Sequence, residues 1–175
     1  MGVETERLRL RPYTVADEAA VFEMFADDAA RRFYPEMVSL EKARSWIEWN
    51  LRNYAQYGFG LWAMELKASG EFAGDCGLTY QDVEEKSELE IGYHLAARHR
   101  GKGYATEAAR ACLDFGFRYT ACASICSIVR PGNAASCAVA GRVHRARREF
   151  VKNGHAALLF YTTREDWEGR DSALV

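Results

Sequence analysis

The chain has 175 residues, of which 49% are hydrophobic and 27% are charged, proportions typical of one globular domain with a substantial core. Its formal net charge of −2 does not support general binding to nucleic acid, which favours strongly basic surfaces. The sequence has neither an apolar run long enough to span a membrane nor the basic-then-apolar start of a signal peptide. From the length we expect a single domain over residues 1–175. The five cysteines resemble small buried residues of a reducing compartment, so we expect a cytoplasmic location.

The first part of the chain predicts one strand followed by two helices. Charged and apolar residues alternate over residues 7–11, which is typical of a strand. Thr14 and Ser39 are suitable N-cap residues, and each precedes a segment with apolar residues at helical spacing. In the second of these segments Asn50 is the only polar member of the apolar face.

The middle of the chain predicts three strands. Residues 61–66 and 72–80 are strand-like runs, and the turn residues at 67–70 between them are typical of a hairpin. A polar linker over residues 81–87 leads to the third strand, at residues 88–95.

The last part of the chain alternates between helices and strands. A helix over residues 104–119 has apolar residues at the 3.6-residue period, and a strand at 124–129 follows it. A shorter helix begins near Ala134, and a hairpin over residues 149–163 turns at Asn153-Gly154. Such interleaving predicts an α/β (α+β) fold, in which a mixed sheet has helices packed on its faces.

A basic loop with two glycines, residues 98–103, leads directly into the helix over residues 104–119. Gly101 and Gly103 allow the backbone to turn tightly and to approach a ligand closely. The first helical turn presents unpaired N–H groups and the positive end of the helix dipole. Positive charge comes from Arg98, His99, Arg100 and Lys102. These features together predict a site for a phosphate-bearing ligand.

Two common phosphate-binding motifs do not fit this loop. A P-loop requires a glycine, four residues and then Gly-Lys-Ser/Thr, and Gly101-Lys102-Gly103 has neither the spacing nor the hydroxyl. A dinucleotide-binding fingerprint requires a third glycine where Thr106 stands, and an acidic residue about 20 residues later, which residues 121–125 lack. From these residues alone, a basic turn without a ligand remains open.

The loop resembles a motif of the GNAT superfamily of N-acetyltransferases. Arg98-x-x-Gly101-x-Gly103 matches the family's Gln/Arg-x-x-Gly-x-Gly/Ala pattern, whose backbone amides hold the pyrophosphate of acetyl-coenzyme A. Residues 90–93 and 101–108 look like the branch that acetylates N-terminal amines of ribosomal proteins. Residues 131–136 are similar to its Asn-x-x-Ser segment, and residues 5–11 to its first strand. The resemblance covers nearly the whole chain and implies a mostly antiparallel, mixed sheet of about six to seven strands with helices on both faces.

Two segments depart from the family pattern. Many relatives have a proline and an aromatic-Trp pair before the Gly-x-Gly, where this chain has Ala97 and His99-Arg100. In residues 141–148 cations replace an apolar turn of the Gly-Met type, and we interpret His144, Arg145, Arg147 and Arg148 as a solvated basic turn. The packing after the shorter helix and the shape of the acceptor pocket are therefore expected to differ from those of relatives, whereas the coenzyme loop is unaffected.

The resemblance implies acetyl-CoA as the cosubstrate. It implies that the backbone around Leu95 and Ala96 pairs with the pantetheine arm, and that Asn133 lies on the pantetheine or adenosine side. The phosphates are expected against Arg98, His99, Arg100, Gly101, Lys102, Gly103, Tyr104 and Ala105. No metal is expected, and the five cysteines lack the spacing of metal-ligand pairs.

The expected reaction is direct transfer of the acetyl group to a primary amine, most simply a protein or peptide N-terminal amine. An α-amine costs roughly 1 kcal/mol to neutralise at pH 7, whereas a lysine side chain costs about 4–5 kcal/mol. The alternatives are a small-molecule amine as acceptor, or an inactive relative that binds acyl-CoA. No nucleic-acid or membrane partner is expected, and a homodimer is possible because dimers are common in this branch.

Two residues are candidates for catalysis. Glu90 lies on the strand that leads to the coenzyme loop, and we expect it to act as the base, directly or through water. Glu88 shares its face of the strand and is the alternative. Ser136 is expected to protonate the leaving thiolate, since relatives in this branch use that serine, although it could instead cap the shorter helix. His94, a lone histidine at the end of the strand, carries little weight as a base.

Overall fold

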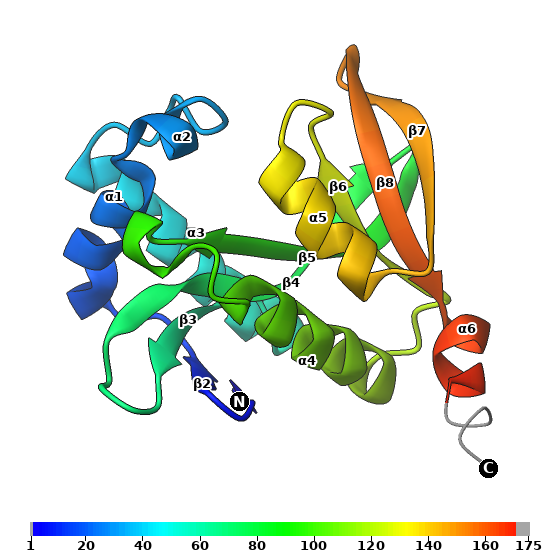
Figure 1. The fold of residues 1–175 in the computed structure, drawn as a ribbon, viewed down its shortest axis with the longest axis horizontal. Coiled ribbons are helices and arrows are strands. Elements are labelled where there is room, and N and C mark those ends of the chain that lie inside the picture. Colours follow the sequence, from blue (N-terminus) through cyan, green and yellow to red (C-terminus); the bar gives the residue numbers. More distant parts are fainter. Residues whose placement is uncertain (1, 171–175) are drawn as a thin grey trace.

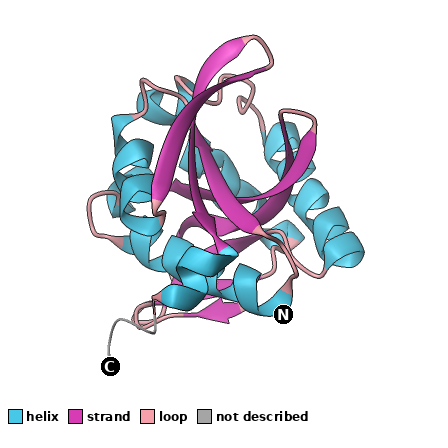
Figure 2. Ribbon diagram, turned by 90° about the vertical axis from the view of Figure 1, so that its right-hand side faces the viewer, coloured by secondary structure: helices cyan, strands magenta, loops and turns pink. Residues whose placement is uncertain are grey.

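The computed structural model describes residues 2–170, which form one mixed sheet with helices on both sides (Figures 1 and 2). The strands are β1 (Val3–Glu4), β2 (Leu8–Arg11), β3 (Leu61–Leu66), β4 (Phe72–Val83), β5 (Lys86–Leu95), β6 (Ser124–Val129), β7 (Ala146–Lys152) and β8 (His155–Thr163). The helices are η1 (Val15–Asp17), α1 (Glu18–Phe25), α2 (Asp28–Arg31), α3 (Leu40–Tyr57), η2 (Ala97–His99), α4 (Tyr104–Tyr119), α5 (Ala134–Val143) and α6 (Arg164–Gly169).

The strand order places the only parallel pair of the described sheet near its middle. The order is β1-β2-β3-β4-β5-β6-β8-β7, and every neighbouring pair except β5–β6 is antiparallel. In the parallel pair only Leu89↔Ile125 and Glu90↔Cys126 are in register. Both strands continue beyond these residues, so the sheet opens between the second half of β5 and the end of β6.

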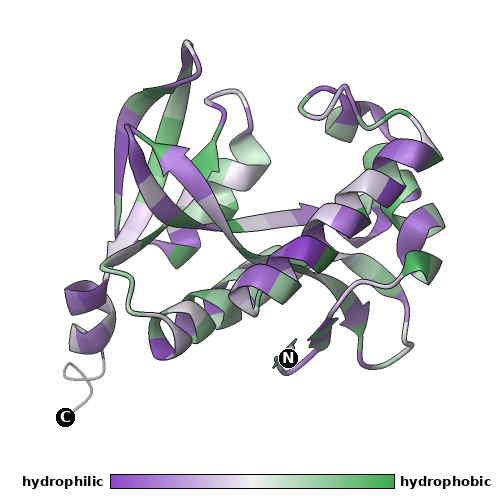
Figure 3. Cartoon of the chain, turned by 180° about the vertical axis from the view of Figure 1, so that it is seen from behind, coloured by the Kyte–Doolittle hydropathy of each residue, from purple (hydrophilic) through white to green (hydrophobic). Residues whose placement is uncertain are grey.

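Strand alternation divides the core between the two faces of the sheet. In β3, Trp62 and Met64 are buried in a cluster that includes α4, whereas Leu61 and Ala63 are buried in a cluster with α1 and α3. Figure 3 shows that the helices carry both hydrophilic and hydrophobic residues along their length, as helices that cover a sheet require. Among the described residues, no helix is long and apolar enough to cross a membrane.

The predicted fold class is confirmed, and several elements have the predicted bounds. The helix Tyr104–Tyr119 and the strands Leu61–Leu66 and Ser124–Val129 begin and end where the sequence places them. The described sheet has eight strands instead of six or seven. The additional strand is β1, whose two residues carry too little pattern to be recognised. Asn153 and Gly154 form the predicted turn, with φ angles of 51° and 78°.

The prediction of a polar linker over residues 81–87 is wrong. β4 continues to Val83 and β5 begins at Lys86, so only Glu84 and Glu85 connect the two strands. Both glutamates have positive φ angles, 52° and 65°, as a tight two-residue hairpin requires. Glutamate is uncommon in that conformation, which is why the composition suggested a linker.

The interpretation of residues 144–148 as a solvated basic turn is also wrong. α5 ends at Val143, and His144 is a buried residue between Ser127 and Thr162. β7 begins at Ala146, and Arg148 on it pairs with Glu84 at 2.7 Å.

Candidate active site

A cavity of about 470 Å³ lies between the N-terminal helices and α5, at the end of the opening in the sheet. One wall comes from α1, α2 and the turn after α2, and the opposite wall comes from α5. The end of β5 and the glycine loop line the remainder. Its volume is that of a site for a sizeable ligand, and we call it the donor cavity.

The predicted coenzyme residues divide into two groups. The donor cavity is lined by Leu95, Arg100, Gly101, Gly103, Ala105 and Asn133. It is not lined by Ala96, Arg98, His99, Lys102 and Tyr104. Two of the expected cations are directed elsewhere, because Arg98 pairs with Glu71 at 2.7 Å and the buried His99 ring lies 3.2 Å from the same carboxylate.

The glycine loop has the geometry that its sequence predicts. Gly101 and Gly103 have φ angles of 75° and 85°, and Gly103 is the N-cap of α4. The start of α4 is fixed from outside by Glu107, whose carboxylate accepts the backbone N–H of Arg7 at 2.9 Å and its guanidinium Nε at 2.6 Å. The loop therefore presents the first N–H groups of a long helix beside the cavity.

Arg100 joins the loop to the opposite wall of the cavity. Its guanidinium donates two hydrogen bonds to Asp27, at 2.8 and 2.7 Å, and a third to the carbonyl of Leu95 at 3.2 Å. Hydrogen bonding to Arg100 holds the pKa of Asp27 below its usual value. Since Asp27 also caps α2, this pair fixes the distance between α2 and the glycine loop.

The edge of β5 presents backbone groups to the opening in the sheet. Ala96 donates to the carbonyl of Ala73 in β4 at 3.0 Å, and antiparallel alternation then directs the peptide groups of Ile91, Tyr93 and Leu95 away from β4. The carbonyl of Ile91 accepts the Ser127 hydroxyl at 2.8 Å. The N–H and C=O of Tyr93 are thus directed towards the space that an extended ligand would occupy.

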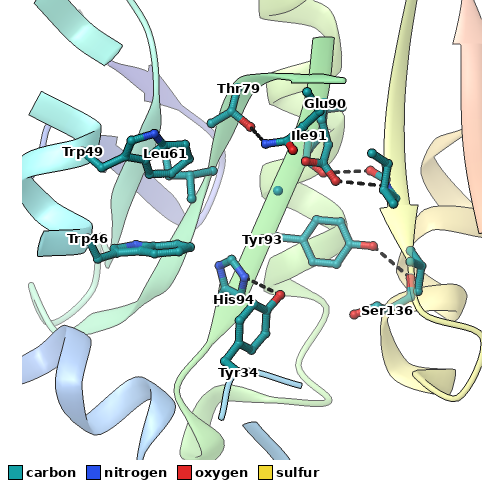
Figure 4. A pocket seen from close by; sticks show the side chains of 15 residues that line it. Tyr34, Trp46, Trp49, Leu61, Thr79, Glu90, Ile91, Tyr93, His94 and Ser136 are labelled. Atoms are coloured by element: carbon teal, nitrogen blue, oxygen red, sulfur yellow. Dashed lines mark hydrogen bonds between the residues drawn. The ribbon is translucent and has the colours of Figure 1, made fainter. Parts of the chain in front are cut away.

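A second cavity, of about 220 Å³, adjoins the first, and we call it the acceptor cavity (Figure 4). Trp46 and Trp49 of α3 form one side, and Ser127 to Val129 of β6 form another. Glu90 and Gly92 line it from β5. The two cavities share Tyr34, Tyr93, His94 and Ser136, so these residues mark the place where two ligands would meet.

Glu90 and Glu88 have different surroundings. The half-buried Glu90 carboxylate lines the acceptor cavity and accepts the N–H of Ile128 at 3.1 Å. Burial raises its pKa above the ordinary value. Glu88 accepts the hydroxyl of Ser124 at 2.8 Å and does not line either cavity.

Ser136 lines both cavities, and it is not the cap of its helix. The N-cap of α5 is Asn133, whose side chain accepts the N–H of Ser136 at 3.1 Å. The carbonyl of Ser136 accepts the hydroxyl of Tyr93 at 2.9 Å, and Figure 4 shows the Tyr93 ring directed towards it.

Three aromatic or imidazole side chains at the junction were missed or given little weight in the sequence. Tyr93, Tyr34 and His94 all line both cavities. Tyr93 comes from β5 and Tyr34 from the turn after α2. Alternation along the strand 88–95 was an available signal for His94, because it places His94 on the same face as Glu90.

A phosphate-suited loop beside one cavity, joined to a second cavity lined by aromatic and acidic side chains, is the arrangement of a transferase with two substrates. Residues 7–144 match the acetyltransferase (GNAT) domain family. The chain is 42% identical to the Bacillus subtilis (strain 168) protein YkkB over 158 residues, 90% of this chain and 92% of that protein. It is 30% identical to the uncharacterized N-acetyltransferase YoaA of the same organism over 136 residues, 77% and 76% of the two chains.

Solved structures with the same fold include acetyltransferases. One from Agrobacterium tumefaciens str. C58 has a TM-score of 0.79 and 28% identity, covering 92% of this chain and 93% of that one. AAC(6′)-Ib in complex with ribostamycin and coenzyme A has a TM-score of 0.77 at 20% identity, covering 93% of this chain and 97% of that one. RimL, the ribosomal L7/L12 α-N-protein acetyltransferase in complex with coenzyme A, has a TM-score of 0.73 at 21% identity, covering 95% of this chain and 99% of that one.

This chain belongs to the GNAT family of acetyltransferases. The arrangement of the described residues gives no group of three or more His, Cys, Asp or Glu side chains that could hold a metal ion. The five cysteines are unpaired thiols, and the buried pair Cys76 and Cys112 has its sulfur atoms 3.6 Å apart.

Proposed function

We propose that this protein transfers the acetyl group of acetyl-CoA to a primary amine, and that the amine is the N-terminus of a protein or peptide. The observation that carries the proposal is the junction of the donor and acceptor cavities at Tyr34, Tyr93, His94 and Ser136. Two substrates bound in these cavities would meet there, which supplies the proximity on which direct transfer depends.

The donor cavity suits coenzyme A along its length. Pyrophosphate would bind at Gly101, Gly103 and the first turn of α4, where N–H groups are unpaired. The pantetheine arm would lie along β5, where the peptide groups of Tyr93 face the opening in the sheet. Arg142 of α5 lines the same cavity and adds positive charge. Solved relatives with coenzyme A bound have the same fold.

The acceptor cavity suits a single amine group with a short substituent. Glu90 supplies negative charge on one side, and Trp46 and Trp49 supply aromatic surface that favours a cation. An N-terminal α-amine costs only roughly 1 kcal/mol to neutralise at pH 7, so it needs little help from a base. The proposal that Ser136 or Tyr93 protonates the thiolate rests on their position at the junction.

A small-molecule amine is the second candidate, because about 220 Å³ enclosed by two tryptophans would hold a compact acceptor entirely. AAC(6′)-Ib, a structure with the same fold, is in complex with the small molecule ribostamycin. An acyl-CoA-binding protein without activity is the third possible outcome.

The test is release of free thiol from acetyl-CoA in the presence of a panel of peptides that differ in their first residue. Each peptide has a matched control with a blocked N-terminus and an internal lysine. Small amines form a second panel. Thiol release with free but not with blocked peptides supports the first candidate, and release with small amines alone supports the second. Coenzyme binding in calorimetry without release on either panel would overturn the proposed transfer.

A further inference from the structure

Asp75 organises a group of buried side chains beside the acceptor cavity. It is fully buried on β4. Its Oδ2 atom accepts the hydroxyl of Tyr13 at 2.7 Å and the indole N–H of Trp46 at 3.0 Å. Its Oδ1 atom lies 2.6 Å from Nδ1 of His94. Trp46 can only donate, and burial together with the Asp75 charge raises the pKa of Tyr13, so its hydroxyl keeps its proton.

These contacts determine which nitrogen of His94 carries the proton. Imidazole is a stronger base than a carboxylate, so the proton between Nδ1 and Asp75 belongs to the ring. In the neutral ring Nε2 is then an acceptor. The hydroxyl of Tyr34 lies 2.8 Å from Nε2 (dashed line in Figure 4) and, with Nε2 an acceptor, it donates this hydrogen bond.

The hydroxyl oxygen of Tyr34 is the end of this chain that faces the substrates. Tyr34 and His94 both line the donor and the acceptor cavities. Burial raises the pKa of Tyr34, and the charges of Glu90 and Asp75 raise it further. The phenol therefore does not ionise by itself, but its oxygen can accept one proton while its own proton passes to Nε2.

We propose that the Tyr34–His94–Asp75 chain accepts the proton that the acceptor ammonium must lose before it attacks. This assignment rests on the proposed function. One N–H bond of R–NH₃⁺ breaks and an O–H bond forms at Tyr34, while the original Tyr34 O–H bond breaks and an N–H bond forms at Nε2 of His94. The imidazolium is held by Asp75 and later releases its proton to solvent. A second amine proton leaves when the amide forms and goes to the coenzyme A thiolate, so the sum is R–NH₃⁺ + acetyl-CoA → R–NH–acetyl + CoA–SH + H⁺.

Acidic and aromatic side chains surround His94. His94 faces the carboxylate of Asp75, which lies on β4. Glu90 lies on the same strand as His94 and on the same face, where only Gly92 separates them. Rings of Phe25 on α1 and Trp46 on α3 lie 5.2 and 5.4 Å from the imidazole. The positive charge of Arg130 lowers the pKa of Tyr34, against the effect of Glu90 and Asp75. Glu90, which already accepts the N–H of Ile128, is assigned the attraction of the ammonium.

The kinetic test compares His94→Gln and Tyr34→Phe with two matched controls, His155→Gln and Tyr80→Phe, on the fastest peptide of the panel. His155 and Tyr80 are exposed and line neither cavity. A proton acceptor contributes about 10²–10⁴-fold, so we expect kcat/KM to fall on the order of 100-fold for His94→Gln. Because the chain acts on the ammonium form of the acceptor, wild-type kcat/KM should rise with pH in a lower step, in which the chain loses its proton, and this step should disappear in His94→Gln. Added imidazole should partly restore His94→Ala, which a structural role would not allow.

A second measurement needs no acceptor. In protein with nitrogen-labelled histidine, the resonance that disappears in His94→Gln should belong to a neutral ring protonated at Nδ1. A ring protonated at Nε2, or an unchanged pH profile in His94→Gln, overturns the chain while leaving the proposed function intact. Absence of thiol release by the wild-type protein on every acceptor overturns the proposed function, and the chain with it.

Discussion

The Glu90 carboxylate accepts the backbone N–H of Ile128 at 3.1 Å and thereby connects β5 to β6 at the point where the two strands separate. The contact keeps a charged group beside the acceptor cavity and fixes the width of the opening there. Its cost is the burial of a carboxylate, which raises the pKa of Glu90.

Glu90→Gln should stabilise the protein and weaken the acceptor site. The amide oxygen can still accept from Ile128. Because the pKa of Glu90 is raised by folding, the charged form is destabilising above that pKa, and this cost disappears as the pH falls through it. The variant should therefore be more stable than wild type at pH 8, with a difference that shrinks in acid. Its KM for the amine should rise about tenfold, or roughly 1.4 kcal/mol.

The matched control is Glu88→Gln, which replaces a neighbouring carboxylate that lines neither cavity. It should leave KM unchanged in the same kinetic assay. If Glu90→Gln removed the lower step of the pH profile, Glu90 would be the base and the assignment to His94 would be wrong.

Gly103→Val should abolish tight coenzyme binding. Gly103 has a φ angle of 85° and a Cβ atom there would lie 3.3 Å from Nη2 of Arg7. A side chain at positive φ costs about 1–2 kcal/mol of stability, and it also distorts the loop that presents N–H groups to the ligand. We expect at least a tenfold loss of affinity in calorimetry, roughly 1.4 kcal/mol.

Gly58→Val separates the loss of stability at a positive φ angle from the distortion of the glycine loop. Gly58 ends α3 with a φ angle of 79°, and a Cβ atom there would contact nothing within 4 Å. Its melting temperature should fall by a similar amount to that of Gly103→Val while coenzyme affinity stays at the wild-type value. Equal affinities in both glycine variants would exclude the loop from the binding site.

The Arg100–Asp27 pair should contribute to coenzyme binding by holding the loop against α2. Arg100→Gln and Asp27→Asn should each weaken coenzyme A by about three- to tenfold, roughly 0.7–1.4 kcal/mol. The double variant should be no weaker than Arg100→Gln alone, since both changes break one interaction. Titration calorimetry on the four proteins gives the coupling directly.

Glu71→Gln is the control for this cycle. It removes the partner of Arg98 but touches neither cavity. Unchanged affinity is expected, and a loss as large as that of Asp27→Asn would show that Arg98 belongs to the coenzyme site after all.

His144 should make the protein sensitive to acid. Burial lowers the pKa of His144 to about 4 from an ordinary value of 6.5. Between these values the unfolded chain binds a proton that the folded chain does not, so stability falls as the pH decreases, by up to about 3 kcal/mol. Denaturant unfolding at several pH values should show this loss in wild type and a flatter dependence in His144→Gln. His155→Gln, at an exposed position, should keep the wild-type slope, and a wild-type slope in His144→Gln would contradict the prediction.

The spacing of apolar residues predicted the helices and strands whose bounds depend on nearby sequence. The apolar period of residues 104–119 and the strands 61–66 and 124–129 agree with the observed bounds. The hairpin at Glu84 and Glu85 could not be predicted, because two glutamates at positive φ are favoured only by the pairing of the strands on either side. His144 was misread for a similar reason, since its burial depends on Ser127 and Thr162, which are distant in the chain.

The sequence by itself determined the donor side of this protein. Gly101, Gly103 and the helix after them are consecutive, so their backbone geometry and their family resemblance can be read from one stretch. The tertiary structure decided the acceptor side, because Tyr34, Asp75 and His94 come from three separate elements and meet only when the sheet is formed. Hydrogen bonds between residues 19 and 60 positions apart leave no periodic trace in a sequence, and they determine which nitrogen of His94 can accept a proton.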